Sequence, residues 1–170
     1  MLHRPYRMAD GTQVILRPIR SDDKRSLGNA FAHLSPETQR LRFLAPKPRL
    51  TTSDLRYLTE IDGSDHVAVA AVPAHDPRFI LGVGRFVRSL ENPEAAEVAI
   101  VIGDPWQHQG LGHHMGLALA DLARAGGVRR FTASMLSDNV AAHRLFASIS
   151  ERLHAEHHHG VEELVAELAA

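Results

Sequence analysis

Three apolar, β-rich runs follow one another in the middle of the chain with only short turns between them. They cover residues 66–72, 79–87 and 97–102, and the sequence breaks at Asp76-Pro77 and Asn92-Pro93. Proline, aspartate and asparagine favour turns, and no helical spacing of apolar residues separates the runs. Strands joined by such short connections pair antiparallel, so the centre of the fold is predicted to be an antiparallel meander.

The segments around this meander carry helix and strand signals of their own. The predicted elements are, in chain order, a strand at 14–19, helices that begin near Ser21, Pro36 and Thr52, the three strands of the meander, a helix over 110–126, a strand over 131–136, a helix after Asn139, and a hairpin over 152–168. The late strand–helix–strand unit implies one parallel pair. We therefore predict a single α/β domain over residues 1–170, with a mixed sheet and helices on both faces. A plain Rossmann fold would alternate strands and helices throughout.

The composition is that of a soluble globular protein, with 44% hydrophobic and 23% charged residues. A formal net charge of −1 argues against a nucleic-acid partner, because such partners select a basic surface. The absence of cysteine excludes disulfides and a cysteine nucleophile. The N-terminus lacks the apolar region of a signal peptide, and no apolar run is long enough to span a membrane. A cytoplasmic protein without a membrane partner is expected.

The segment from Glu97 to Gly112 carries the strongest chemical signal. An apolar strand enters a tight loop, and Gly110 and Gly112 stand where a helix begins. The first N–H groups of a helix lack intrahelical acceptors, so a glycine-rich helix start can hold phosphate without basic side chains. The alternative is that both glycines only shape the turn. A dinucleotide-binding motif needs a third glycine where this chain has Met115. A P-loop needs a lysine where this chain has His113.

This segment resembles the GNAT family of N-acetyltransferases. Gln107-x-x-Gly110-x-Gly112 matches the family signature, and Asn139, Ala142 and Leu145 resemble the pattern on its next helix. Further segments resemble the acetyltransferase domain of bacterial Pat-type protein-lysine acetyltransferases: Leu16–Arg20, Leu34–Thr38, Leu41–Phe43, Ala96–Ala99, Arg129–Phe131 and Arg144–Phe146. The resemblance covers a core of about residues 14–168.

The resemblance implies a mostly antiparallel sheet of six to seven strands, whose fourth and fifth strands diverge to admit the pantetheine arm of acetyl-CoA. Acetyl-CoA is then the acyl donor, and no metal is required. The implied cofactor-binding residues are Val101, Ile102, Gln107, His108, Gln109, Gly110, Leu111, Gly112, His113 and Asn139. Asn139 is also suited to capping its helix.

Glu97 is the candidate general base. Acetyl transfer needs an unprotonated amine, and an alkyl ammonium is almost wholly protonated near neutral pH. Several family members place their base at the start of this strand. The alternative is an exposed carboxylate at a strand end, with Glu94 as the nearest substitute.

The general acid for the departing thiolate stays unassigned. Many family members use a tyrosine that Phe146 replaces here, and Tyr6 and Tyr57 lie far upstream. The histidines at 113–114 and 157–159 lack the i, i+4 spacing of helical zinc ligands, so surface histidines are expected and no metal site.

The function favoured at this point is acetylation of a primary amine, either a protein lysine or a small molecule. A catalytically silent acyl-CoA sensor is the alternative from another class. Pat-type proteins often carry a regulatory domain, which a chain of this length is expected to lack. The sequence leaves the oligomeric state open, with a homodimer among the alternatives.

Overall fold

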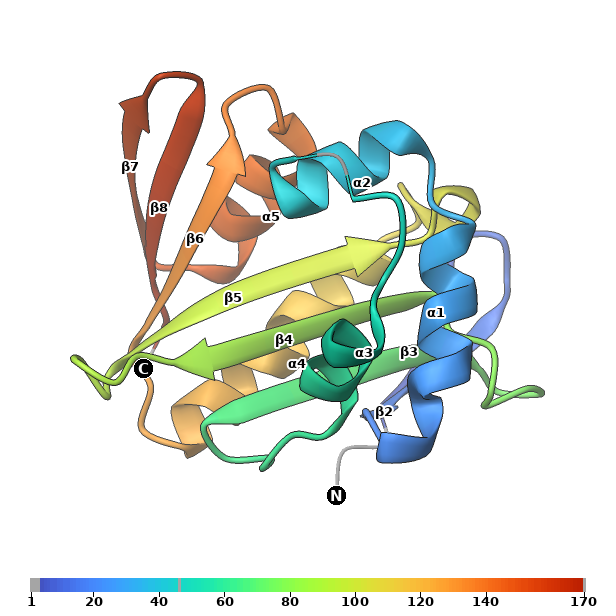
Figure 1. The fold of residues 1–170 in the computed structure, drawn as a ribbon. Helices are drawn as coiled ribbons and strands as arrows, with labels where there is room; N and C mark the ends of the chain where they lie inside the picture. Colours follow the sequence, from blue (N-terminus) through green and yellow to red (C-terminus); the bar gives the residue numbers. More distant parts are fainter. Residues whose placement is uncertain (1–3, 46, 170) are drawn as a thin grey trace.

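The computed structural model describes residues 4–45 and 47–169, and one eight-stranded sheet forms its centre (Figure 1). The strand order across the sheet is β1-β2-β3-β4-β5-β6-β8-β7. The strands are β1 (Arg4–Arg7), β2 (Gln13–Pro18), β3 (His66–Pro73), β4 (Gly82–Arg88), β5 (Ala95–Ile102), β6 (Arg130–Leu136), β7 (Arg152–His158) and β8 (Val161–Glu167).

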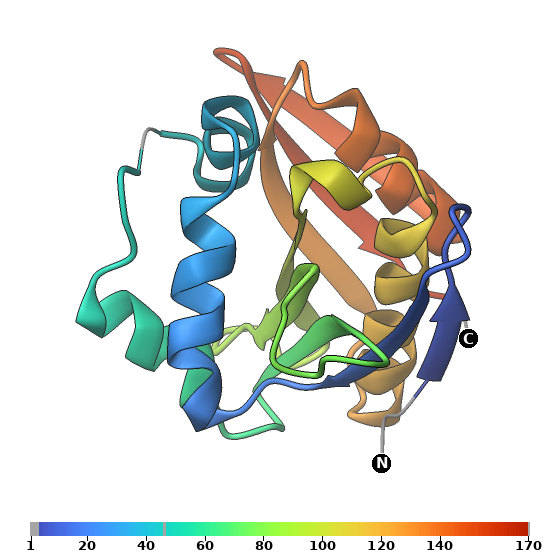
Figure 2. The ribbon, with the colours of Figure 1, turned by 90° about the vertical axis from the view of Figure 1, so that its right-hand side faces the viewer.

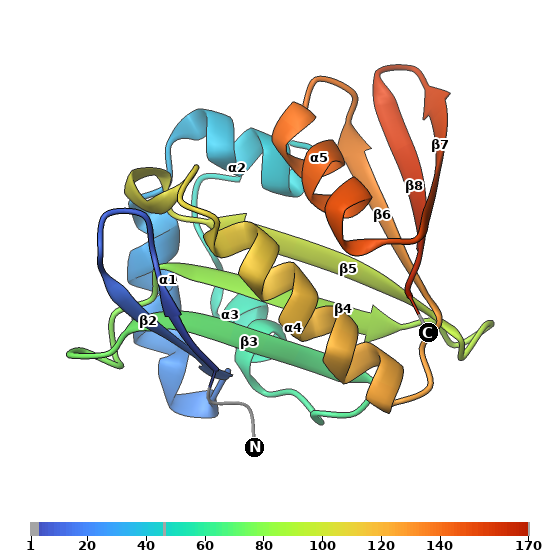
Figure 3. The same cartoon turned by 180° about the vertical axis from the view of Figure 1, so that it is seen from behind.

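Helices cover both faces of the sheet, as predicted. Figures 1 and 3 show α1, α2 and α3 on one face and α4 and α5 on the other, and Figure 2 shows the sheet between the two layers. The helices are α1 (Lys24–Ala32), α2 (Pro36–Phe43), α3 (Thr52–Thr59), α4 (Leu111–Ala125) and α5 (Val140–Ile149), with 3-10 turns η1 (Ser21–Asp23) and η2 (Asp104–Trp106). The predicted α/β class and the mixed sheet are confirmed.

The sheet has eight strands instead of the predicted six to seven, because β1 was not predicted. Its sequence, Arg-Pro-Tyr-Arg, has no alternation of apolar residues that would predict a strand. It is a strand because it pairs antiparallel with β2, for example Tyr6 with Val14. This pairing is a tertiary interaction that the local sequence does not predict.

The predicted strand at 79–87 begins three residues late, at Gly82. Ile80 and Leu81 are apolar because they are buried against neighbouring elements, not because they belong to the strand. The Leu81 N–H donates to the Ala71 carbonyl at 2.8 Å, and the Leu81 carbonyl accepts from the Gly103 N–H at 2.8 Å. A buried loop whose backbone groups are hydrogen-bonded therefore has the same apolar sequence pattern as a strand.

The long helix α4 anchors the larger core cluster. Leu111, Met115, Ala118 and Leu119 recur at helical spacing and are all buried. Gly110 precedes the helix with a φ of 82°, and Gly126 ends it. A second cluster lies under α1 and α3 on the opposite face. The two clusters hold the sheet between them.

Strands β5 and β6 form the parallel pair that the sequence predicts, but the described pairing covers three positions. These are Ala95 with Arg130, Ala96 with Phe131 and Glu97 with Thr132. Past Glu97 the two strands diverge (Figure 1), and β6 continues as the antiparallel neighbour of β8. This divergence sets the position of the site described next.

Candidate active site

A cavity of about 790 Å³ occupies the gap where β5 and β6 separate. One wall is β5 from Glu97 to Ile102, and the other consists of β6 and α5. The start of α4 and part of α2 close its ends. Because β5 continues past its last pair with β6, its backbone polar groups on that side have no strand partner there. A ligand with amide groups can therefore bind along β5.

The loop between β5 and α4 is held by side-chain hydrogen bonds. Gln107 Nε2 donates to the Ile102 carbonyl at 2.9 Å and to Thr38 Oγ1 at 3.2 Å. His108 and Gly110 both have a positive φ, 59° and 82° respectively. The His114 N–H donates to the Gly110 carbonyl at 3.1 Å. The N–H groups just before it have no intrahelical acceptor and face the position where an anion is stabilised by the helix dipole.

The two glycines of this loop have different structural reasons. A Cβ on Gly110 would collide with Tyr6 Oη, and its positive φ disfavours other residues. A Cβ on Gly112 would lie 3.9 Å from Ile102 Cγ1 and from Leu145 Cδ2, which is ordinary contact. Gly110 is thus required by the turn itself. Packing does not require Gly112, whose missing side chain leaves space in the cavity between β5 and α5.

Tyr6 of β1 fixes the outer side of the loop. Its hydroxyl donates to the Gln109 carbonyl at 2.8 Å, and its ring stacks on His114 at 4.5 Å between centroids. Tyr6 could not be predicted as part of this site, because 103 residues separate it from Gln109 and β1 has no strand signal of its own. His114 was expected at the surface, but this stacking makes its ring part of the packing against β1.

Two of the predicted cofactor residues do not line the cavity with their side chains. Gln109 Oε1 accepts from the Asp10 N–H at 3.3 Å, so this side chain faces the β1–β2 turn. Leu111 is buried in the core. Their backbone N–H groups still belong to the loop. The other predicted residues line the cavity: Glu97, Val101, Ile102, Gln107, His108, Gly110, Gly112, His113 and Asn139.

Asp104 joins the same loop to α2. Its carboxylate accepts from Ser35 Oγ at 2.6 Å, from the Ser35 N–H at 2.9 Å and from Thr38 Oγ1 at 2.7 Å. Burial raises the pKa of Asp104, but these hydrogen bonds outweigh it and hold the pKa below its ordinary value. Because α2 buries no residue fully, these polar contacts and its Ser35 cap position it against the cavity.

Glu97 lies at the point where β5 and β6 part, opposite Thr132, and its side chain is exposed to the cavity. Glu94 precedes β5 and is outside the cavity lining. Its carbonyl accepts from the N–H groups of Arg129 and Arg130 at 2.7 and 3.0 Å. Of the two carboxylates considered from the sequence, Glu97 is therefore the one that a ligand in the cavity can reach.

The far wall consists of Asn139, Phe146 and their neighbours. Asn139 Oδ1 accepts from the Ala142 N–H at 3.1 Å, which confirms the predicted helix cap. Phe146 is buried and lines the cavity. Neither Tyr6 nor Tyr57 belongs to this lining in the described chain. The acid for a leaving thiolate therefore stays unassigned.

The described histidines and carboxylates do not gather into a metal site. No group of three or more that could hold a metal ion occurs within residues 4–45 and 47–169. Across the same residues, no helix has the length and apolar character needed to cross a membrane. His113 Nδ1 lies 2.8 Å from Ser148 Oγ, and both residues line the cavity.

A diverging strand pair that ends at an anion-binding helix start defines a site suited to a long ligand with amide and phosphate groups. The family model described as acetyltransferase (GNAT) domain matches residues 13–149. The chain therefore belongs to the GNAT family of acetyltransferases, which confirms the resemblance and the predicted class of enzyme.

Individual proteins agree with this assignment. The chain is 35% identical over 142 residues to Acetyltransferase Pat of Mycolicibacterium smegmatis, a match that covers 83% of this chain and 42% of Pat. It thus spans less than half the length of that relative. The GNAT domain of S. lividans PAT superposes with a TM-score of 0.88 at 27% identity, over 98% of this chain and 97% of that domain. The fold also matches yncA, a putative acetyltransferase from Salmonella typhimurium with its cofactor acetyl-CoA, at a TM-score of 0.68 and 18% identity, over 91% of this chain and 92% of yncA.

Proposed function

We propose that this protein transfers an acetyl group from acetyl-CoA to a primary amine, directly and within a ternary complex. The observation that carries the proposal is the cavity between β5 and β6, which runs from Glu97 to the start of α4. The pantetheine arm would bind along β5 at Val101 and Ile102. The pyrophosphate would lie on the N–H groups of residues 108–112, with His108 and His113 beside it and Asn139 across the gap.

The assignment of the loop rests on its glycines and its free N–H groups. The helix start supplies a partial positive charge, and the cavity beside Gly112 has space that a side chain would take. The Gln107 side chain occupies the Ile102 carbonyl, so the N–H is the backbone group of Ile102 that remains for the pantetheine at this end. Val101 pairs with Val83 of β4, in the register in which the Gly103 N–H donates to the Leu81 carbonyl, so its backbone groups face β4 and it meets the ligand by its side chain. The role of Gln107 is then to hold the loop, because its side chain donates to the Ile102 carbonyl and its own N–H donates to the Asp104 carbonyl at 3.4 Å. The N–H groups that follow it would bind the phosphate.

Glu97 would act as the general base. The acceptor ammonium gives one proton to Glu97, directly or through water, and the free amine attacks the thioester carbonyl carbon. A C–N bond forms, the nitrogen loses its second proton, and the C–S bond breaks to release the CoA thiolate, which takes up a proton. Backbone N–H groups near Ile102 would stabilise the oxygen that becomes negative during the attack.

A protein lysine is the first acceptor to test, because the chain resembles the catalytic domain of Pat-type enzymes. A small-molecule amine is the second, and a mostly apolar cavity of about 540 Å³ next to Arg42 favours it. The test is release of free thiol from acetyl-CoA in the presence of a panel of proteins and amines. Acetyl-CoA binding without thiol release on any acceptor would support the silent sensor and contradict the proposed transfer.

A further inference from the structure

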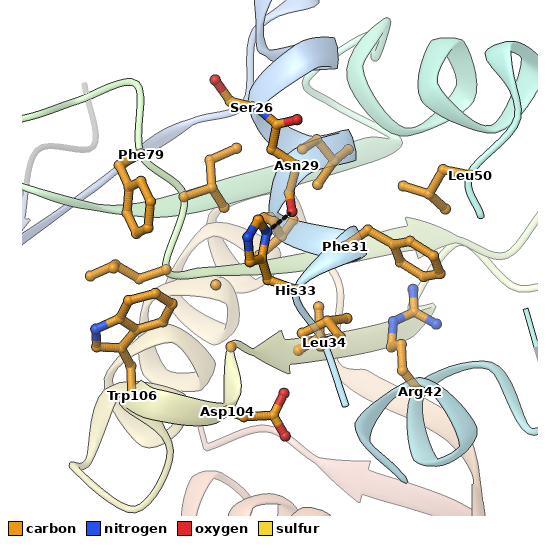
Figure 4. Close-up of a pocket in the computed structure, with 18 of the residues that line it drawn as sticks. Ser26, Asn29, Phe31, His33, Leu34, Arg42, Leu50, Phe79, Asp104 and Trp106 are labelled. Atoms are coloured by element: carbon orange, nitrogen blue, oxygen red, sulfur yellow. Dashed lines mark hydrogen bonds between the residues drawn. The ribbon is translucent and has the colours of Figure 1, made fainter. Parts of the chain in front are cut away.

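A second cavity, of about 540 Å³, lies beside the cavity between β5 and β6. It is on the face of the sheet that carries α1, α2 and α3. Its walls are mostly apolar side chains from α1, the loop after α2, and the segment before β4, as Figure 4 shows. Arg42, Phe43, Val101 and Trp106 line both cavities. The two spaces therefore adjoin each other at these four residues.

Arg42 is the polar group at this junction. Its side chain rises from α2 into the second cavity, towards Phe31 (Figure 4). Its guanidinium lies over the Phe43 ring, with Cζ 4.8 Å from the ring centroid, and among the described residues no hydrogen-bond acceptor reaches it. Its neighbour in the sequence of α2, Arg40, is by contrast paired with Glu37 at 2.8 Å and with Asp138 at 2.9 Å. A partly buried guanidinium without a hydrogen-bonded anion is costly unless a ligand supplies one.

The surroundings of Arg42 contain charges of both signs, Arg85 on one side and Glu97 on the other. Arg85 is buried, lines the same cavity and donates to the Leu58 carbonyl at 3.3 Å, while its Nη1 lies 3.0 Å from His66 Nε2. Burial, followed by the charge of Arg42, lowers the pKa of Arg85 to about 10. Burial also lowers the pKa of Arg42, an effect that the negative charge of Glu97 opposes. Arg42 and Glu97 thus attract each other across the junction without a direct ion pair.

We infer that the second cavity is the acceptor site and that it takes an amine bearing a carboxylate and an apolar side chain, that is, an apolar α-amino acid. The carboxylate would form a paired hydrogen bond with the Arg42 guanidinium, which matches its geometry. The ammonium group, two bonds away, would face Glu97, and the apolar side chain would fill the cavity among residues such as Phe31, Leu34 and Leu50. This inference rests on the proposed function, because it assumes that Glu97 serves the amine.

Thiol release with phenylalanine and with 2-phenylethylamine tests the inference, because the two amines differ by the carboxylate. We expect kcat/KM for phenylalanine to exceed that for 2-phenylethylamine by about 10- to 100-fold, the range for hydrogen bonds to a charged partner. Arg42→Gln should remove this preference, mainly by lowering the value for phenylalanine. Arg42→Lys should keep part of it. Arg40→Gln is the matched control on the same helix and should leave the preference unchanged.

Four kinetic outcomes would overturn the inference. Equal use of both amines by the wild type would do so, as would an Arg42→Gln variant that loses both activities equally. A lysine-containing protein used far better than any amino acid would favour the protein acceptor instead. A fourth arm compares acetyl-CoA with succinyl-CoA. If Arg42→Gln changes the preference between donors and leaves the acceptors unaffected, the carboxylate belongs to the acyl group and the inference is wrong.

A binding measurement separates failure of this inference from failure of the proposed function. If no amine releases thiol, the proposed transfer fails, but titration calorimetry of phenylalanine against wild type and Arg42→Gln still tests the carboxylate site. Binding that is lost in Arg42→Gln and kept in Arg40→Gln supports it. Equal binding to all three proteins, or none to the wild type with acetyl-CoA present, contradicts it. Thermal melts of each variant show that the compared proteins are folded.

Discussion

Substitutions of Gly112 distinguish a steric effect on acetyl-CoA binding from an electrostatic one. A methyl group at this position meets its nearest neighbours, Ile102 and Leu145, at 3.9 Å, so Gly112→Ala should fold normally. Since alanine restricts the unfolded chain more than glycine does, and position 112 is helical, we expect a gain of about 0.5–1 kcal/mol in the free energy of unfolding. Acetyl-CoA affinity should fall only modestly in this variant.

Gly112→Glu adds a negative charge where the pyrophosphate is proposed to lie. Two unit charges about 4 Å apart at an effective dielectric constant of about 20 repel each other by about 4 kcal/mol. Screening by solvent and salt reduces this value, and about 3 kcal/mol still corresponds to more than a 100-fold loss of affinity. Gly112→Gln takes up nearly the same volume without the charge, so the difference between Glu and Gln reports the electrostatic part.

Titration calorimetry with acetyl-CoA, at two salt concentrations and with melting curves for each variant, measures these effects. The Glu variant should recover part of its affinity at high salt, and the Gln variant should not. A Gly112→Glu protein that binds acetyl-CoA as tightly as the wild type would refute the placement of the pyrophosphate. Equal losses of acetyl-CoA affinity in Gly112→Glu and Gly112→Gln would show that side-chain volume at this position, and not negative charge, prevents binding.

Three further predictions concern binding, catalysis and the loop. At about 100 times their dissociation constants, acetyl-CoA and CoA should each stabilise the native state by about 2.7 kcal/mol, or about 5–10 °C in melting temperature for a domain of this size, whereas NADH and ATP at the same concentrations should not. Glu97→Gln should lower the rate of thiol release at neutral pH by about 10²–10⁴-fold with little change in acetyl-CoA affinity. That loss should shrink as the pH approaches the pKa of the amine, and an unchanged pH–rate profile would reduce Glu97 to a strand-end carboxylate. Tyr6→Phe keeps the stacking on His114 but removes the hydrogen bond to Gln109. Acetyl-CoA binding should therefore weaken several-fold, and the free energy of unfolding should fall by about 1 kcal/mol. Unaltered binding would contradict a positioning role for Tyr6.

The parts of the fold that are visible in the sequence are those with a strong periodic signal. The meander of β3, β4 and β5 and the helix α4 follow from apolar runs and helical spacing, and the parallel pair follows from the helix between its strands. Strand β1 and the start of β4 depend on tertiary contacts instead. Ile80 and Leu81 show the difficulty, because burial in a loop and burial in a strand select the same residues.

The candidate site divides in the same way. The loop after β5 and Glu97 are contiguous in the sequence, so the cavity that they line could be anticipated. Arg42 could not, because α2 buries no residue fully and its position depends on hydrogen bonds from Ser35 and Thr38 to Asp104. A partly buried guanidinium that contacts an aromatic ring and has no hydrogen-bonded anion is recognisable only in the folded structure.

The short β5–β6 pairing also has a consequence for local unfolding. Three residue pairs join the half-sheet β1–β5 to the half-sheet β6–β8–β7, with further contact between α4 and α5. A seam of this length is a natural boundary between two cooperative units for local unfolding. A molecule bound along β5 and against α5 would bridge that seam and link the units. Amide hydrogen exchange should then slow on both sides of the seam when acetyl-CoA binds, including in strands β8 and β7 that do not touch it.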